Sequence, residues 1–261
     1  GEGQSLFPEV DLLCESLSRL PSLDLEPADG DFADRGAWMG AVAAEAAGAL
    51  RGWLVSGARL PPEVCAPQPG SYARRLLCAC PRGRFQVIAM TWAPGQSAPL
   101  HDHAGLWCVE GIYSGRMMAQ DWGAPAPAGT DLVRFQPPKE WMSQQIGHVE
   151  TVVPPQEFHV LTNPFQDSAV TIHIYGGRMR SCHMFVPHVC AEGKGELTSE
   201  GLLFSRRRAE LRFTPAGSPS PPGASKLVGA APASCAREAH ARSSPRSEEF
   251  APETPPEKTL P

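Results

Sequence analysis

The chain has 261 residues, of which 42% are hydrophobic, so it is long enough to bury a sizeable core in one large domain or two small ones. Its formal net charge of −5 gives no general indication of a nucleic acid or an anionic membrane surface as partner. The sequence has no apolar run of the length that spans a bilayer and no basic, apolar leader near residue 1, so we expect a cytoplasmic protein.

Residues 1–70 have the periodicity of helices. Apolar residues recur at helical spacing in residues 8–20, and again in the alanine-rich residues 36–56. We expect these helices to cover one end of the domain that follows.

Residues 71–213 consist of short apolar runs separated by glycine and proline. The predicted strands are residues 75–80, 85–92, 107–113, 116–121, 131–135, 148–153, 158–161 and 169–175. About eight short strands with turn residues between them indicate a barrel or sandwich. The strands do not alternate with helices, so a parallel α/β sheet is not expected.

The last segment, residues 214–261, is rich in proline and serine and has one aromatic residue, Phe250. Such a composition buries too little apolar surface to offset the entropy of ordering, so we expect a disordered tail. The predicted organisation is therefore a helical segment (1–70), a barrel (71–213) and a tail (214–261).

Eight cysteines are spread along the chain, and an even number would allow four disulfides. The chain is longer and more hydrophobic than the small secreted domains that depend on disulfides, and no secretion signal accompanies the cysteines. We therefore expect reduced thiols.

Three histidines form a candidate metal site. His101 and His103 are separated by one residue, and on a strand this spacing puts both imidazoles on the same face. His159 supplies a third imidazole, which we expect from a facing strand. Imidazole binds iron, zinc, copper and nickel, and three imidazoles leave coordination positions for substrate and O₂. We predict one metal ion at His101, His103 and His159.

The residues around these histidines resemble the two signatures of the cupin superfamily. The first signature is matched in spacing by Gly95, His101, His103 and Gly115, and the end of the second by His159 and Asn163. The resemblance implies a mainly β protein, a cupin-type double-stranded β-helix barrel with N-terminal α-helices.

One position departs from the usual cupin pattern. Cys108 stands where cupins usually carry a glutamate as fourth metal ligand, which leaves a neutral three-histidine site. Glu110 is two residues out of register for that role. A first cupin motif with cysteine at this place resembles the thiol dioxygenases, and within them the cysteine dioxygenases, over residues 72–185.

That resemblance implies Fe(II) as cofactor and further residues around it. It implies that Cys108 can form a thioether with Tyr175, and that Thr171, His173 and Tyr175 form a relay in which threonine replaces the family's serine. Alternation along a strand puts these last three residues on one face. Next to Tyr175, however, Gly176 begins a Gly-Gly-Arg segment where the family has Ser-Pro-Pro.

The resemblance also implies a substrate site. Tyr72 and Arg74 match the family's Tyr-x-Arg, whose arginine holds the substrate carboxylate, with Arg75 as the alternative by one residue. Trp92, nine residues before His101, also fits the family's pattern and is expected near the substrate.

The function implied is a non-haem iron enzyme that uses O₂ to oxidise the thiol of L-cysteine to cysteine sulfinic acid. Thiolate, amine and O₂ are expected on the open metal positions. Two alternatives remain open, namely a dioxygenase for 3-mercaptopropionate or another small thiol, and a metal-binding cupin module without turnover. The expected partners are the thiol and O₂, without nucleic acid or membrane, and we expect a monomer.

Overall fold

The computed structural model describes residues 4–25, 27, 32–188, 197–198 and 201–215, and within them the fold is built from two antiparallel sheets. The first sheet has the strand order β1 (Gln4–Ser5), β2 (Ala73–Ala79), β3 (Gln86–Trp92), β12 (Ala169–Tyr175), β5 (Cys108–Ser114) and β10 (Val149–Val152). The second has the order β7 (Ala126–Pro127), β8 (Leu132–Phe135), β15 (Gly201–Glu210), β13 (Ser181–Pro187), β4 (Ser97–His101), β11 (Phe158–Thr162), β6 (Arg116–Trp122) and β9 (Met142–Gln145), and β14 (Leu197–Thr198) pairs with β15. This mainly β architecture confirms the predicted cupin-type barrel.

The central strands of the first sheet separate two apolar layers. Every residue of β3 and β12 is buried, because both faces of the sheet are covered. Ile172 and Ile174 of β12 pack outward against the helices, whereas Tyr175 packs inward among residues from both sheets. The side chains of Thr171 and His173, which alternate with the outward residues, therefore enter the barrel interior.

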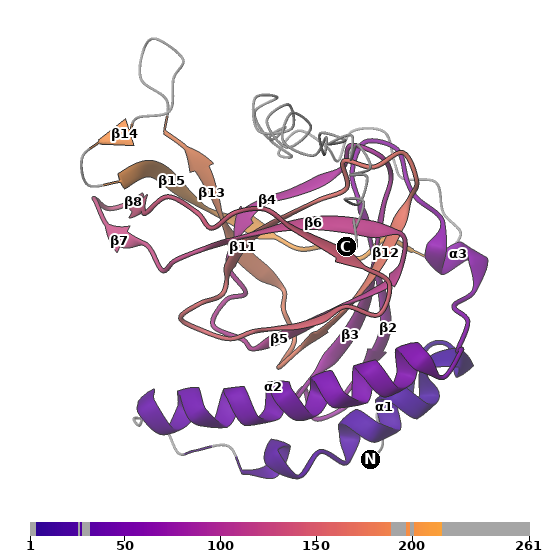
Figure 1. The fold of residues 1–261 in the computed structure, drawn as a ribbon. Coiled ribbons are helices and arrows are strands. Elements are labelled where there is room, and N and C mark those ends of the chain that lie inside the picture. The colour runs from indigo at the N-terminus through magenta and orange to yellow at the C-terminus, as the bar shows by residue number, and fades with distance from the viewer. Residues whose placement is uncertain (1–3, 26, 28–31, 189–196, 199–200, 216–261) are drawn as a thin grey trace, which may run out of the picture. The chain divides into compact units, whose positions relative to one another are not determined.

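The helices cover the outer face of the first sheet. They are α1 (Asp11–Ser18), α2 (Phe32–Val55) and the short α3 (Pro62–Cys65), with 3₁₀ turns at Pro8–Val10 and Pro21–Asp24. Figure 1 shows α1 and α2 lying along strands β2, β3 and β5. Leu50 of α2 packs so closely over β5 that a Cβ on Gly111 would lie 2.8 Å from it.

The helices were predicted correctly, but their expected place at one end of the barrel is wrong. Leu77, Val87 and Val109 form an apolar outer surface on β2, β3 and β5, and the helices bury this surface. None of the described helices is both long enough and apolar enough to cross a membrane.

The expectation of reduced thiols is wrong for one pair of cysteines. Cys14 of α1 and Cys78 of β2 are joined in a disulfide, both buried, with Cα atoms 6.5 Å apart. The reason is geometric, since α1 packs on β2 and brings the two Cα atoms within the usual range for a disulfide. The free cysteines among the described residues are Cys65, Cys80, Cys108 and Cys182.

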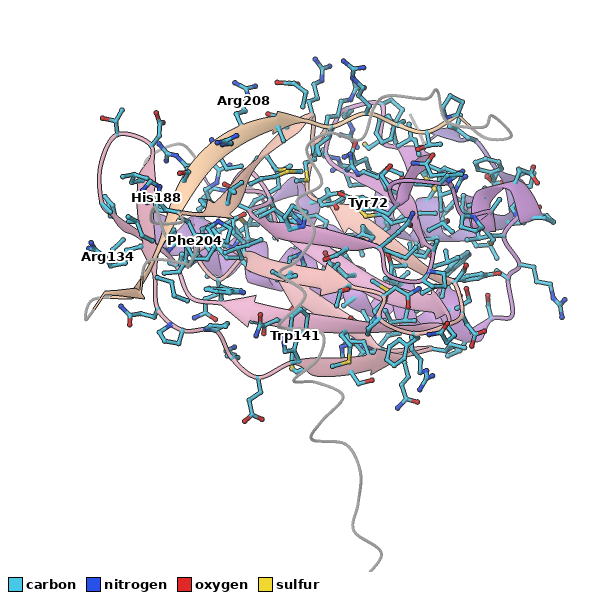
Figure 2. The ribbon with its side chains drawn as sticks, turned by 90° about the horizontal axis from the view of Figure 1, so that it is seen from above. Tyr72, Arg134, Trp141, His188, Phe204 and Arg208 are labelled. Carbon is cyan, nitrogen blue, oxygen red and sulfur yellow. A yellow bond between two sulfur atoms is a disulfide. The ribbon has the colours of Figure 1, made fainter. Side chains whose placement is uncertain are left out.

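A second, smaller core lies at the far end of the second sheet. Phe135 and Phe204 stack edge to face with ring centroids 5.3 Å apart, and Trp122 packs against both. Figure 2 shows Phe204 and Arg134 together on the left of the molecule, away from Tyr72. This aromatic cluster is separate from the interior that surrounds the histidines.

Candidate metal centre and the adjoining cavity

The three predicted histidines converge. Strand β4 ends at His101, and His159 of β11 lies directly opposite it in the antiparallel pair. The ring centroids are 4.8 Å apart for His101 and His159, 4.9 Å for His103 and His159, and 5.2 Å for His101 and His103. Two details of the prediction are wrong, because His103 lies in the turn after β4 and His159 comes from the neighbouring strand, not a facing one.

The ring nitrogens of this cluster fit a divalent metal ion. The Nδ1 atoms of His101 and His103 lie 2.9 Å from the carbonyl oxygens of Pro99 and Glu157, which can only accept, so each Nδ1 carries the hydrogen and donates it. This leaves the Nε2 lone pairs for a metal. The Nε2 atoms of His103 and His159 are buried without a hydrogen-bond partner among the described residues, and one ligand atom from each of the three rings lies within 4.8 Å of the others.

Burial also keeps the imidazoles in the form that binds metals. It lowers the pKa of His101 well below its ordinary value and lowers the pKa of His159 to about 4. Both rings are therefore neutral at physiological pH. Neutral imidazoles are ligands for the borderline divalent metals, iron among them.

Two carboxylates that sequence reasoning missed fix the turn between the first two histidines. Asp102 accepts hydrogen bonds from the backbone N–H groups of Ala104 and His183, and one of its oxygens lies 2.8 Å from His183 Nδ1. Glu157 accepts the backbone N–H of His103 at 2.9 Å. The turn that carries His103 is thus held from β13 on one side and from the segment before β11 on the other.

The hydrogen-bonded chain through Thr171 and His173 on β12 ends at Glu110, not at Tyr175 as predicted. Trp92 Nε1 donates to Thr171 Oγ1 at 2.9 Å, and this hydroxyl lies 2.6 Å from His173 Nε2. His173 Nδ1 lies 3.0 Å from Glu110 Oε1. Both nitrogens of His173 are therefore engaged, and its ring stacks on Tyr175 with the centroids 6.1 Å apart.

Cys108 and Tyr175 face each other across two strands. They are directly opposed in the antiparallel pairing of β5 with β12, and both are buried. Burial raises the pKa of the Cys108 thiol and of the Tyr175 hydroxyl well above their ordinary values. Both groups are therefore protonated at neutral pH.

A small cavity adjoins the histidines on the side of His101. Its lining combines that ring with polar groups of β2 and β12 and with sulfur-containing and apolar side chains, including Tyr72, Arg74, His101, Tyr175, Cys182 and Leu211. Arg74 is buried, and its Nη1 atom has no hydrogen-bond partner among the described residues. A buried guanidinium nitrogen without a partner is suited to an anionic ligand.

The structure distinguishes the positions of Arg74 and Arg75, which the sequence alone did not. Arg75 is on the opposite face of β2, where it donates to the carbonyl oxygens of Val64 and Ala66. Trp92, which we expected near the substrate, is not among the residues that line the cavity. Its ring stacks behind Tyr72 with the centroids 4.4 Å apart.

The segment that follows β15 adds residues to this site that were not predicted from the sequence. Phe213 lies over the Arg74 guanidinium, 5.7 Å from carbon to ring centroid. The Thr214 N–H donates to the Arg74 carbonyl at 2.6 Å, and the Arg74 N–H donates to Thr214 Oγ1 at 3.2 Å. Thr214, the first residue of the predicted tail, is thus paired with β2.

The Gly-Gly-Arg departure from the family pattern has a packing reason. A Cβ on Gly176 would collide with the indole of Trp107, and the Gly176 N–H donates to the Trp107 carbonyl at 2.8 Å. Trp107 thus fills the space that a side chain at position 176 would need, directly beside Tyr175.

We expect Gly176→Ala to lower the free energy of unfolding by about 1–3 kcal/mol, the usual cost of overpacking a core. Urea denaturation measures this loss. In a Trp107→Ala background, Gly176→Ala should leave the free energy of unfolding almost unchanged, because the indole ring that would clash is absent. Gly177→Ala is the matched control, since its Cβ would lie 3.2 Å from the flexible end of Leu106. Equal losses at Gly176 in both backgrounds would contradict this packing account.

Comparison with known proteins agrees with this site. The model of the family described as cysteine dioxygenase type I matches residues 68–187, which span β2 to β13. Solved structures match more weakly. The protein TT1209 from Thermus thermophilus is 16% identical, over 46% of this chain and 97% of that one, with a TM-score of 0.35.

Two further structures have similar scores. A conserved protein with a double-stranded beta-helix domain from Klebsiella pneumoniae is 16% identical, over 45% of this chain and 88% of that one, with a TM-score of 0.34. An oxalate oxidase in complex with the substrate analogue glycolate is 13% identical, over 42% of this chain and 53% of that one, with a TM-score of 0.31. The match to the cysteine dioxygenase type I family covers just under half of the chain, and this similar region includes the histidine cluster and the barrel strands from β2 to β13.

Proposed function

We propose that the protein is an Fe(II)- and O₂-dependent dioxygenase that oxidises the thiol of L-cysteine to cysteine sulfinic acid. The observation that carries this proposal is the cavity in which His101 of the metal cluster and the Arg74 guanidinium face the same small space. A thiol with a carboxylate a few bonds away matches these two groups, with its sulfur toward the metal and its carboxylate on the arginine.

The residues at the cavity would bind different parts of the substrate. His101, His103 and His159 would hold Fe(II), and the bound ion would supply a Lewis acid that favours the thiolate form of the substrate and a place for O₂. Arg74 pairs with the substrate carboxylate through two charge-assisted hydrogen bonds and so fixes the position of the sulfur.

Tyr175 and the segment that follows β15 complete the proposed site. Because burial raises the pKa of Tyr175, its Oη atom keeps its proton and can donate a hydrogen bond to a substrate oxygen. Leu211 lines the cavity and Phe213 covers the Arg74 side chain, so both exclude water from the ion pair. Both atoms of one O₂ end in the sulfinate, which balances the reaction without another reductant.

3-Mercaptopropionate is the second candidate substrate, because it carries the same thiol and carboxylate. An oxygen electrode distinguishes the candidates when Fe(II)-loaded protein is given cysteine, 3-mercaptopropionate, cysteamine or buffer alone. We expect uptake with cysteine, one O₂ for each sulfinate formed. Oxygen uptake with 3-mercaptopropionate alone would identify that thiol as the substrate in place of cysteine. No oxygen uptake with any thiol would indicate a metal-binding module without turnover.

We also propose that Cys108 and Tyr175 become joined by a thioether, since the strand register sets them opposite each other. Formation of the C–S bond removes one hydrogen from the thiol and one from the phenol ring, and O₂ takes up the two electrons and two protons. Intact mass spectrometry after incubation with Fe(II), O₂ and cysteine should show the loss of two hydrogens. Cys108→Ser should keep its mass, and an unchanged mass in the unaltered protein would refute the crosslink.

A further inference from the structure

Glu110 is a buried carboxylate at the centre of the histidine cluster. It lies on β5 directly opposite His173 of β12, and its side chain is 8% exposed. Its Oε1 atom is 3.0 Å from His173 Nδ1, 3.5 Å from His159 Nε2 and 3.7 Å from His103 Nε2. One carboxylate oxygen thus approaches the free nitrogens of two of the three candidate metal ligands.

This arrangement lacks a compensating positive charge among the residues that the structure describes. Glu110 forms no ion pair with a described lysine or arginine, and its contacts are imidazoles and the Cys108 thiol. His103 donates its Nδ1–H to the Glu157 carbonyl, so its Nε2 atom presents a lone pair toward the carboxylate. A buried anion beside a lone pair is costly unless a cation lies between them.

We propose that Glu110 is a fourth protein donor to the metal ion, so that the centre is three imidazoles and one carboxylate. This inference rests on the metal centre of the proposed function and changes its charge. Carboxylate oxygen and imidazole nitrogen together suit a divalent first-row metal. The group reaches the ion from two residues beyond Cys108, because alternate residues of a strand share a face.

A fourth donor also restricts the substrate. A six-coordinate ion with four protein donors keeps two positions, enough for one sulfur and one O₂. The substrate amine, for which the family resemblance implies a metal position, then has none while Glu110 is bound. The site is therefore suited to small carboxylate-bearing thiols that bind through sulfur alone.

Metal affinity tests this proposal without reference to turnover. Apo-protein is titrated with Co(II) in competition with a coloured chelator, and the dissociation constant is compared between variants. Loss of a group that only orients a ligand costs 10- to 100-fold in affinity, so loss of a ligand in Glu110→Gln should weaken Co(II) binding by about 100-fold or more. Glutamine can still accept the His173 hydrogen bond, so the protein fold is retained. Glu110→Leu is the second variant should the first not fold.

Two matched variants separate the outcomes. His173→Gln removes the hydrogen-bond partner of Glu110, and Glu150→Gln removes a carboxylate directly opposite Glu110 on β10. Glu150→Gln should bind Co(II) within about 3-fold of the unaltered protein, whereas His173→Gln, which removes a group that only orients Glu110, should lose clearly less affinity than Glu110→Gln. The proposal is overturned if Glu110→Gln also stays within 3-fold, or if His173→Gln loses as much affinity as Glu110→Gln. If the unaltered protein binds no Co(II), the metal centre fails as well.

Discussion

His159→Ala should reduce Fe(II) affinity by more than about 100-fold and remove thiol oxidation with it, because loss of outer-shell partners alone costs 10- to 100-fold. The ring of His159 lies within 4.9 Å of both other imidazoles, measured between centroids, and its Nε2 atom has no hydrogen-bond partner among the described residues. Alanine leaves two imidazoles on a centre that needs three. Iron content after anaerobic loading and desalting measures the loss.

The matched control for this experiment is His148→Ala. The His148 side chain is 45% exposed and pairs with Glu150, outside the histidine cluster. Its removal should leave iron content and oxygen uptake unchanged. If His159→Ala retained a full equivalent of iron, the three-histidine centre would be wrong.

Arg74→Ala should lower kcat/KM for cysteine by about 100-fold, because an unpaired charge in a buried site costs about 2–5 kcal/mol. Cysteamine has no carboxylate, so its oxidation should change far less. The Arg74 guanidinium lines the cavity beside His101 and Tyr175 and has a nitrogen without a partner in the described residues. Steady-state oxygen uptake with both thiols gives the comparison.

Arg74→Lys refines this test. Lysine keeps the positive charge but cannot form the paired hydrogen bonds of a guanidinium, so cysteine oxidation should fall between the unaltered protein and Arg74→Ala. Equal losses for cysteine and cysteamine in Arg74→Ala would remove Arg74 from the carboxylate role. They would indicate that the substitution disturbs β2 or the cover formed by Phe213.

Much of the barrel could be predicted because its inner strands are apolar. Residues 169–175 were predicted with the bounds of β12, and each of the other seven predicted runs coincides with a strand to within about two residues. Strands β4, β9, β13 and β15 were missed, as were the two-residue strands β1, β7 and β14. β15 contains three consecutive arginines, and β9 is polar, so neither shows the apolar alternation that marks a half-buried strand.

The metal ligands could be predicted from local spacing, but their surroundings could not. Asp102 and His183 are 81 residues apart in the chain, and His173 and Glu110 are 63 residues apart. Only the register of β12 on β5, and of β13 on β4, brings these groups together. Which of the two adjacent arginines lines the cavity depends likewise on which face of β2 points into the barrel. The local sequence does not reveal that face, so Arg74 could not be distinguished from Arg75 by sequence alone.

X-ray absorption at the iron edge, on Fe(II)-loaded protein before and after cysteine is added, measures the claimed centre directly. The expected spectrum has imidazole nitrogen scatterers in both states and gains a sulfur scatterer when the thiol binds. A first shell without imidazole scattering, or one that admits no sulfur at saturating cysteine, would contradict the account.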